Sequence, residues 1–337
     1  MTNKKSVIVG VSGLSLTNDE KDLLKKYLPL GVILFSRNIK NNRQLYDLTC
    51  EIKDILGNCS LILIDQEGGR VQRLRKPNCT NYPAANIFGK LAKISIKDAV
   101  RATYLNYLLL GTDLTKVGIN VNCAPCLDVK SSNTHEVIGD RAFSSNPKIV
   151  SLLGEAACKG LIKSGVLPVI KHIPGHGRAE SDSHLSLPII KDKVISLDKS
   201  DFLPFKKLSN MPMAMTAHIL YKDIDNKWPI TQSKIANKFI RQNIKYKGIL
   251  LSDDIDMLAL SGSIQDKMKS IYEADYDIIL HCSGDINTTE LVLRNGNTVS
   301  NDLLSKIKAN TDRLIKNNNA IDLSLCKTEL NNFLKSI

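Results

Sequence analysis

Short runs of apolar, largely β-branched residues recur along the chain, and they are separated by longer stretches in which apolar residues return with helical spacing. Runs that are apolar nearly throughout are typical of parallel strands buried on both faces. They occupy residues 7–11, 31–35, 61–65, 119–125, 166–172, 212–218, 248–254 and 277–282. The pattern therefore predicts a sheet of buried parallel strands.

Amphipathic helices are predicted between these strands. The first begins at TNDE, where Thr17 and Glu20 have the spacing of a capping box. The others cover about 42–56, 95–116, 148–164, 198–209, 231–243, 262–274 and 301–316. Eight strands alternating with eight helices predict an α/β fold with a single (β/α)8 TIM barrel. The alternative is an open doubly wound sheet, but GVSG near the start does not supply its Gly-rich phosphate-binding loop.

The length and composition favour one large domain. The chain has 337 residues, is 43% hydrophobic, and contains no Pro/Gly/Ser-rich linker. We expect a catalytic barrel over residues 1–318 and a C-terminal tail over 319–337 that packs on it. The first apolar run is too short and too interrupted for a signal peptide, and no apolar stretch approaches the roughly 20 residues of a membrane span. A cytoplasmic protein is therefore expected.

Charge and cysteine content narrow the set of partners. The net charge of +12 comes mainly from scattered lysines, and aromatic residues make up only 5% of the chain, which is unlike a nucleic-acid-binding surface. The pair CAPC at 123–126 has redox or zinc spacing, but no second pair accompanies it, so a structural role is predicted. We expect a monomer that acts on a small molecule, with no cofactor, nucleic-acid or membrane partner.

Polar residues collect where the predicted strands end. Asp65 ends the third strand, the pair Lys171–His172 the fifth, and Asp253 lies in the SDD that ends the seventh. The stretch KHIPGHGRAESDSH at 171–184 holds half of the six histidines of the chain. Active sites of TIM barrels form at the C-terminal ends of the strands, and unpaired buried charges are costly. These side chains are therefore predicted to face a common solvated pocket.

The chemistry of these residues suits a sugar. Asp65 can accept hydrogen bonds from vicinal hydroxyls, and Arg70, Arg73 and Arg141 can bind hydroxyls or carboxylates. The pair Gly68–Gly69 permits a tight turn and a close approach of the backbone to a ligand. Taken alone, this signal has low specificity.

Several motifs together carry a family resemblance. They are LIDQEGGRVQRL, IGDRAF, KHIPGHG, DSH, TAHILY and LLSDDIDM, and they span residues 63–257. The chain resembles glycoside hydrolase family 3, and within it the bacterial β-N-acetylhexosaminidases of cell-wall recycling. The resemblance implies a retaining exo-β-N-acetylglucosaminidase. Its substrate would be β-1,4-linked (anhydro)muramoyl-peptide fragments of peptidoglycan, from which it would remove the non-reducing terminal N-acetylglucosamine.

The resemblance also implies the catalytic residues. Asp253 matches the nucleophile, His184 the acid/base and Asp182 the partner of that histidine. Many relatives take a carboxylic acid/base from a second domain, for which we expect no room in this chain. A carboxylic acid would need its pKa raised by about 2 units to hold a proton at neutral pH, whereas an imidazole titrates near about 6.5 without tuning. The histidine is therefore chemically reasonable.

A second group matches the substrate-binding residues of the family. These are Asp65, Arg73, Arg141, Lys171 and His172. His176 lies between two glycines of the same loop, and a role in loop packing is favoured over a catalytic one.

Other functions use the same residue types. A metal-dependent barrel hydrolase could draw ligands from His172, His176, His184, His218 and Asp253, although no His-x-His pair follows the first strand. A phosphorylase is a second alternative, because a neutral histidine tolerates an incoming phosphate better than a carboxylate does. A non-catalytic sugar-binding barrel is a third, and the intact catalytic set argues against it.

Overall fold

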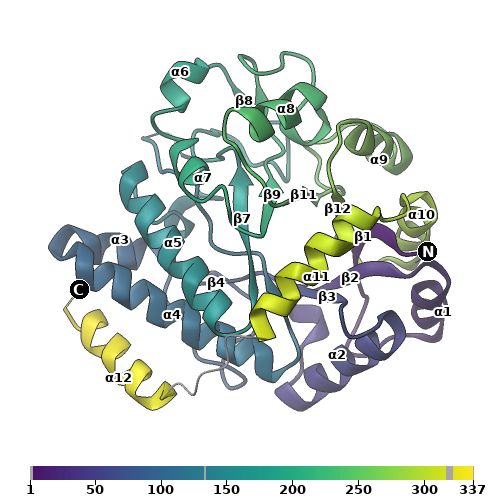
Figure 1. Ribbon diagram of the computed structural model, residues 1–337, viewed down its shortest axis with the longest axis horizontal. Coiled ribbons are helices and arrows are strands. Elements are labelled where there is room, and N and C mark those ends of the chain that lie inside the picture. Colours follow the sequence, from purple (N-terminus) through teal and green to yellow (C-terminus); the bar gives the residue numbers. More distant parts are fainter. Residues whose placement is uncertain (1–2, 133, 316–321, 337) are drawn as a thin grey trace.

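The computed structural model describes residues 3–132, 134–315 and 322–336. Within these residues, parallel strands close into a barrel in the order β1-β12-β11-β9-β7-β6-β3-β2 (Figure 1). The strands are β1 (Lys5–Gly10), β2 (Pro29–Leu34), β3 (Leu61–Ile64), β6 (Val121–Asn122), β7 (Leu167–Ile173), β9 (Met213–Thr216), β11 (Ile249–Asp254) and β12 (Ile278–His281). Each lies within or beside one of the apolar runs, so the predicted TIM barrel is confirmed.

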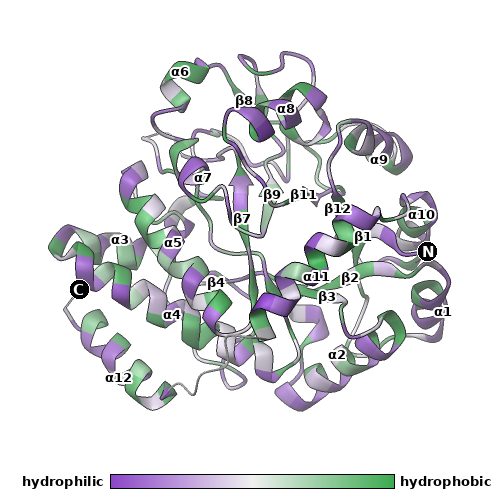
Figure 2. Cartoon of the chain, in the orientation of Figure 1, coloured by the Kyte–Doolittle hydropathy of each residue, from purple (hydrophilic) through white to green (hydrophobic). Residues whose placement is uncertain are grey.

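The barrel strands are apolar on both faces because both faces are covered. In β3, Leu61 and Leu63 belong to the cluster inside the barrel, whereas Ile62 and Ile64 pack outward in the cluster shared with the helices. This is the alternation expected of a strand. In Figure 2 green and purple bands alternate along the surrounding helices, and the end of β7 at the centre is purple.

A ring of helices surrounds the barrel. It comprises α1 (Asn18–Tyr27), α2 (Asn42–Leu56), α4 (Ile96–Lys116), α5 (Pro147–Lys163), α7 (Leu203–Lys207), α8 (Lys234–Gln242), α9 (Ile264–Glu273) and α10 (Ile286–Asn295). The predicted capping box is present at the start of α1, where the Thr17 side chain accepts a bond from the Glu20 N–H and the Glu20 side chain accepts one from the Thr17 N–H. The helix predicted over 198–209 is shorter in the structure and is reduced to α7.

The eighth predicted helix has a different place from the one expected. Helix α10, which the sequence pattern did not reveal, contacts α1, α9 and β1 and so fills the ring position after β12. The predicted helix is α11 (Asn301–Ile315), and it lies across the barrel opening (Figure 1). Its residues Leu303 and Ile307 join the interior cluster together with Leu30, Leu61 and Leu167 from the strand starts. Helix α11 therefore closes the end of the barrel opposite the predicted site.

Several smaller elements lie outside the barrel and its ring of helices. They are the hairpin of β4 (Gln66–Gly68) and β5 (Val71–Gln72), the parallel pair β8 (Ile189–Ile190) and β10 (Leu220–Tyr221), and the helices α3 (Ala85–Ile94), α6 (Val194–Leu197) and α12 (Leu323–Leu334).

The C-terminal helix α12 packs on α4. Its Glu329 binds both Nε and Nη2 of Arg101 at 2.8 Å, and Cys326 and Leu330 enter the core. The expected domain boundary at 318/319 lies outside the described residues. Of the helices that are described, none has the length and apolar character needed to cross a membrane.

Candidate active site

The C-terminal ends of the barrel strands open into a cavity of about 270 Å³. Asp65 enters it just after β3, Lys171 and His172 enter it from the end of β7, and Asp253 enters it from β11. His184 reaches it from the long loop that follows β7. The polar strand ends therefore meet at one place, as the sequence predicts.

A network of ion pairs forms one wall of the cavity. The Lys171 Nζ lies 2.7 Å from Asp65 and 2.8 Å from Glu67. Arg141 binds both oxygens of Glu67, at 2.8 and 3.0 Å, and Arg73 lies 3.3 Å from Asp65. Burial opposes the charge on both acids and on Lys171, but their partners outweigh it: the pKa values of Asp65 and Glu67 are lowered and that of Lys171 is raised. The wall therefore stays charged, with its donors held in fixed positions.

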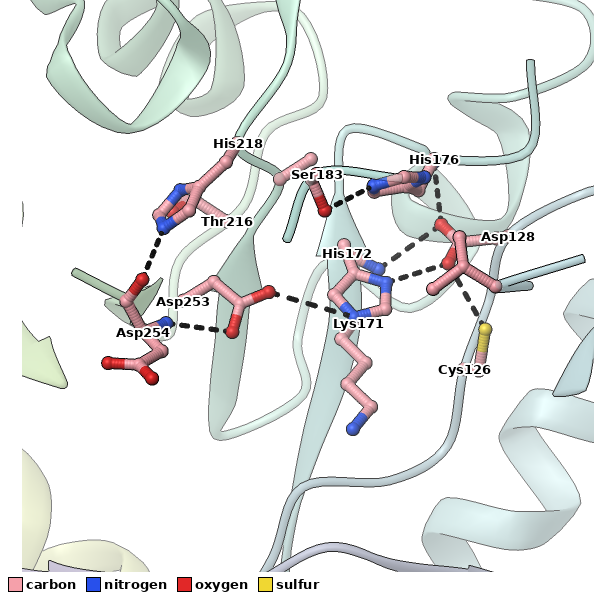
Figure 3. A network of polar contacts seen from close by, with 12 residues as sticks. Cys126, Asp128, Lys171, His172, His176, Ser183, Thr216, His218, Asp253 and Asp254 are labelled. Atoms are coloured by element: carbon pink, nitrogen blue, oxygen red, sulfur yellow. Dashed lines mark hydrogen bonds and ion pairs between the residues drawn. The ribbon is translucent and has the colours of Figure 1, made fainter. Parts of the chain in front are cut away.

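A buried aspartate–histidine pair lies beside this wall (Figure 3). The Asp128 carboxylate accepts bonds from the His172 ring Nδ1 at 2.7 Å, from the backbone N–H groups of His172 and His176, and from the Cys126 thiol. Burial opposes its ionisation, yet the charge and hydrogen bonds of His172 hold the pKa of Asp128 well below its usual range. The His172 Nε2 then faces Asp253 at 4.0 Å. Asp128 thus fixes the orientation of the ring next to Asp253.

Asp253 points into the cavity because successive side chains of strand β11 alternate between its two faces. It is two residues beyond Leu251, which packs inside the barrel, so its side chain faces the barrel axis and the cavity. Burial favours the neutral acid, but the electrostatic interactions with His172 and His218 and the hydrogen bond from the Asp254 N–H lower the pKa of Asp253. The residue is therefore an ionised carboxylate at neutral pH, as a nucleophile must be.

The neighbouring Asp254 is engaged by the backbone around it. Its carboxylate accepts bonds from the N–H groups of Asp256 at 3.2 Å and Cys282 at 3.1 Å. Its carbonyl oxygen lies 2.9 Å from the His218 Nε2, which must donate because a carbonyl can only accept. Burial, together with the charges of Asp256 and Asp253, raises the pKa of Asp254 to about 6. The contacts thus distinguish the two adjacent aspartates: Asp253 faces His172, and Asp254 ties two loops together.

A second aspartate–histidine pair lies on the loop after β7. The Asp182 carboxylate contacts the His184 Nδ1 at 2.7 Å and accepts a bond from the His184 backbone N–H at 2.9 Å. Burial opposes the charge of Asp182, but these two contacts lower its pKa. The His184 side chain is 62% exposed and lies at the edge of the cavity. Such a ring can exchange protons with both solvent and a bound molecule.

Known proteins are similar to this chain in sequence and in fold. Residues 3–316 match the glycosyl hydrolase family 3 N-terminal domain. The chain belongs to glycoside hydrolase family 3. It is 38% identical to a β-hexosaminidase of Neisseria gonorrhoeae over 301 residues, which cover 87% of this chain and 81% of that protein.

Two solved structures have the same fold as this chain. Native NagZ from Neisseria gonorrhoeae matches with a TM-score of 0.88 at 31% identity, covering 98% of each chain. The same values hold for that protein in complex with N-trifluoroacetyl-D-glucosamine. The predicted family resemblance is therefore confirmed, and this chain is a glycoside hydrolase.

The structure brings the predicted site residues of this family 3 enzyme together. Asp253, His184, Lys171, His172, Asp65, Arg73 and Arg141 line the cavity. Asp182 lies behind His184 and touches its ring. The roles carried over from the family stay predictions, but their geometry is compatible with joint action on one bound molecule.

Two further residues of the site were given no specific role from the sequence. Glu67 binds Lys171 and Arg141, and Asp128 orients His172. Asp128 carries a signal that could have identified it, because a lone acid in the apolar run CAPCLDV needs a buried partner. Glu67 lies in the polar stretch that follows the third strand, which places it near the pocket, but nothing local indicates its partners.

The glycine pair has a local function. A Cβ on Gly68 would lie 2.3 Å from the Pro83 carbonyl oxygen, and one on Gly69 would lie 2.6 Å from the Ala84 Cβ. Both glycines also have positive φ angles, of 102° and 59°. The close approach predicted for a ligand is instead made to the segment 83–84 of this chain.

The residues of the metal-site alternative have separate partners. His172 binds Asp128, His184 binds Asp182, and His218 binds Thr231 and the Asp254 carbonyl. Within the described ranges, the groups of three potential ligands are Cys126–Asp128–His172 and Asp254–Asp256–His281, and neither combines the residues proposed in that alternative. All eight cysteines are free thiols, those of CAPC included.

Proposed function

We propose that this family 3 hydrolase is a retaining exo-β-N-acetylglucosaminidase. It removes the non-reducing terminal N-acetylglucosamine from β-1,4-linked (anhydro)muramoyl-peptide fragments during peptidoglycan recycling in the cytoplasm. One observation carries the proposal: an ionised Asp253 lies deep in the cavity while a solvent-reaching His184, backed by Asp182, lies at its edge. The β-hexosaminidase relative and the amino-sugar derivative bound by gonococcal NagZ support the substrate class.

The first chemical step uses both residues. An Asp253 oxygen attacks the anomeric carbon of the sugar while the bond from that carbon to the leaving oxygen breaks. The protonated His184 ring gives its proton to the leaving oxygen, and Asp182 stabilises the ring cation before the transfer. The products are a glycosyl ester on Asp253 and the released muramoyl fragment.

The second step returns the enzyme to its starting state. The neutral His184 ring removes a proton from a water molecule, whose oxygen attacks the anomeric carbon and displaces Asp253. Two displacements at the same carbon retain its configuration. An imidazole suits both steps because it gains and loses a proton near neutral pH.

The size and charge of the cavity fit one terminal amino sugar. Sites for drug-sized ligands usually have about 300–1,000 Å³, so a cavity of about 270 Å³ accommodates a single ring and favours exo action. Its hydroxyl and acetamido groups are bound by the polar side chains of Asp65, Arg73, Arg141, Lys171 and His172. The basic surface of the chain, with a net charge of +12, suits the carboxylates of a peptide stem.

Substrate preference tests the sugar assignment. We expect kcat/KM on an aryl β-N-acetylglucosaminide to exceed that on the matching aryl β-glucoside by at least about 100-fold, because buried polar groups are left unpaired without the acetamido group. Release of N-acetylglucosamine from an anhydromuramoyl peptide tests the natural substrate. A preference for the glucoside would refute the proposal.

Trapping tests the retaining mechanism. A slow fluorinated N-acetylglucosaminyl substrate should leave a covalent adduct, and peptide mapping should place it on Asp253. An adduct on Asp254, or inversion at the anomeric carbon, would contradict the mechanism. Formation of a sugar phosphate when phosphate is added would assign the chain to the phosphorylases instead.

A further inference from the structure

The turn that carries His184 is anchored through its middle residue. Asp182 and His184 are accessible to solvent, but Ser183 between them is only 4% exposed. Its hydroxyl lies 3.1 Å from the His176 Nε2 (Figure 3). Two backbone contacts also reach the turn, from the Ala259 N–H to the Ser183 carbonyl at 3.2 Å and from the Leu258 N–H to the His184 carbonyl at 3.4 Å. The His176–Ser183 bond is therefore the side-chain anchor of an otherwise exposed turn.

His176 belongs to an arm of the loop that is fixed to the barrel. Its backbone N–H donates to Asp128 at 2.7 Å, and the Tyr221 hydroxyl donates to the Gly175 carbonyl at 2.6 Å. A Cβ on Gly177 would lie 1.8 Å from the Val129 carbonyl oxygen, so this arm packs directly against the neighbouring segment. The ring of His176 is held where it can fix the position of the Ser183 hydroxyl.

The hydrogen-bond partners define which nitrogen of His176 carries the proton. Burial lowers the pKa of His176 to about 4, so the ring is neutral at pH 7. Its Nδ1 has no hydrogen-bond partner within the described ranges. A buried N–H without an acceptor costs more than an unused lone pair, so the proton belongs on Nε2 and is donated to Ser183.

We infer that His176 is a positioning residue, which holds the acid/base His184 over the cavity through its hydrogen bond to Ser183. The inference rests on the proposed function, because it assumes that His184 transfers a proton to the leaving oxygen. Without the bond, the contacts that tie the turn to other segments of the described chain are the two backbone bonds from Leu258 and Ala259, of which one is long. A displaced His184 ring harms proton transfer in both steps, but kcat/KM reports only the first step, in which the loss falls on leaving groups that need a proton.

Paired variants test this role. The side chains in His176→Gln and His176→Met have nearly the same shape, but only the amide can donate to Ser183. On N,N′-diacetylchitobiose, whose leaving group needs protonation, we expect His176→Met and Ser183→Ala to lose about 10- to 100-fold in kcat/KM. On a dinitrophenyl glycoside, whose leaving group needs no proton, the same variants should lose less than about threefold, and His176→Gln should stay near wild type on both.

The same substitutions made in the His184→Ala enzyme distinguish a positioning role of His176 from a role in folding. In the His184→Ala enzyme no acid/base remains to be positioned, so adding His176→Met should lower the residual rate by less than about twofold. An equal loss on both substrates, or a loss that persists in the His184→Ala background, would overturn the inference. If His176→Met fails to fold, Ser183→Ala on the exposed turn carries the same test. A wild-type enzyme without β-N-acetylglucosaminidase activity, or a His184→Ala variant without a leaving-group effect, would instead refute the proposed function.

Discussion

Two aspartate–histidine pairs flank the same cavity, and in both the histidine Nδ1 lies 2.7 Å from a carboxylate oxygen. The surroundings of the pairs are opposite. The side chains of His172 and Asp128 are 6% and 0% exposed, whereas those of His184 and Asp182 are 62% and 22% exposed. Because the contact is the same, any difference in what the pairs do must come from where they lie.

The buried pair holds its geometry and its charge. Asp128 accepts bonds from the His172 ring, two backbone N–H groups and a thiol, so a change in its charge would leave several donors without an acceptor. The exposed pair has fewer constraints, because the Asp182 carboxylate accepts bonds from His184 alone, through the ring Nδ1 and the backbone N–H. The first pair is therefore suited to fixing the wall beside Asp253, and the second to moving a proton.

The largest expected effect concerns the carboxylate that the buried pair supports. Asp253→Ala should lower kcat by at least about 10⁴-fold, because no other carboxylate faces the anomeric carbon in the proposed mechanism. Binding of N-acetylglucosamine, measured by calorimetry, should persist. Asp254→Ala is the matched control and should retain far more activity. Similar losses in both variants would show that the two adjacent aspartates do not differ as their contacts indicate.

The next effect compares the pairs in stability. Asp128→Asn should lower the free energy of unfolding by about 3–5 kcal/mol, because the amide cannot accept all four bonds and leaves buried donors unpaired. Asp182→Asn should cost under about 1 kcal/mol, because water can replace the lost contact. Urea unfolding of both variants measures the difference. Equal costs would mean that burial does not separate the roles of the pairs.

This difference also shows what the sequence could and could not reveal. The apolar runs predicted every barrel strand, because strand formation depends on the local sequence. The polar residues at the strand ends then predicted where the cavity lies. Alternation alone also indicates Asp253, since it follows Ile249 and Leu251 on the inward face of β11. This argument needs the strand to stay regular through its last residues, and only the structure shows that β11 continues to Asp254.

Partners that come from distant parts of the chain could not be predicted. Asp128 meets His172 across 44 residues, and Glu67 meets Arg141 across 74. The eighth ring helix was also missed, because α10 has the polar sequence INTTELVLRN and buries only one side. Local patterns establish that a polar residue needs a partner, but only the closed barrel identifies that partner.

A smaller effect tests the exposed pair in catalysis. Asp182→Asn should lower kcat/KM by about 10- to 100-fold on a disaccharide and much less on an activated aryl glycoside, because the protonated His184 ring loses its nearest negative charge. The measurement is kcat/KM on both substrates. An unchanged leaving-group dependence would remove Asp182 from the dyad.

The smallest effect concerns how the two pairs respond to acid. The pKa of each aspartate is lowered in the folded protein, so each stabilises the fold above the ordinary carboxyl pKa near about 4 and loses that contribution as the pH falls toward the folded value.

For the fully buried Asp128 the lowering of the pKa is large. The stability advantage of the wild type over Asp128→Asn should therefore shrink below about pH 4, by up to about 1.4 kcal/mol per pH unit. Asp65 and Glu67 are present in both proteins, so their own titration cancels in the difference. The advantage over Asp182→Asn should stay nearly constant, because solvent screens that carboxylate. Unfolding free energies measured from about pH 6 to pH 3 would show one sloping and one flat difference curve, and two parallel curves would contradict the distinction between the pairs.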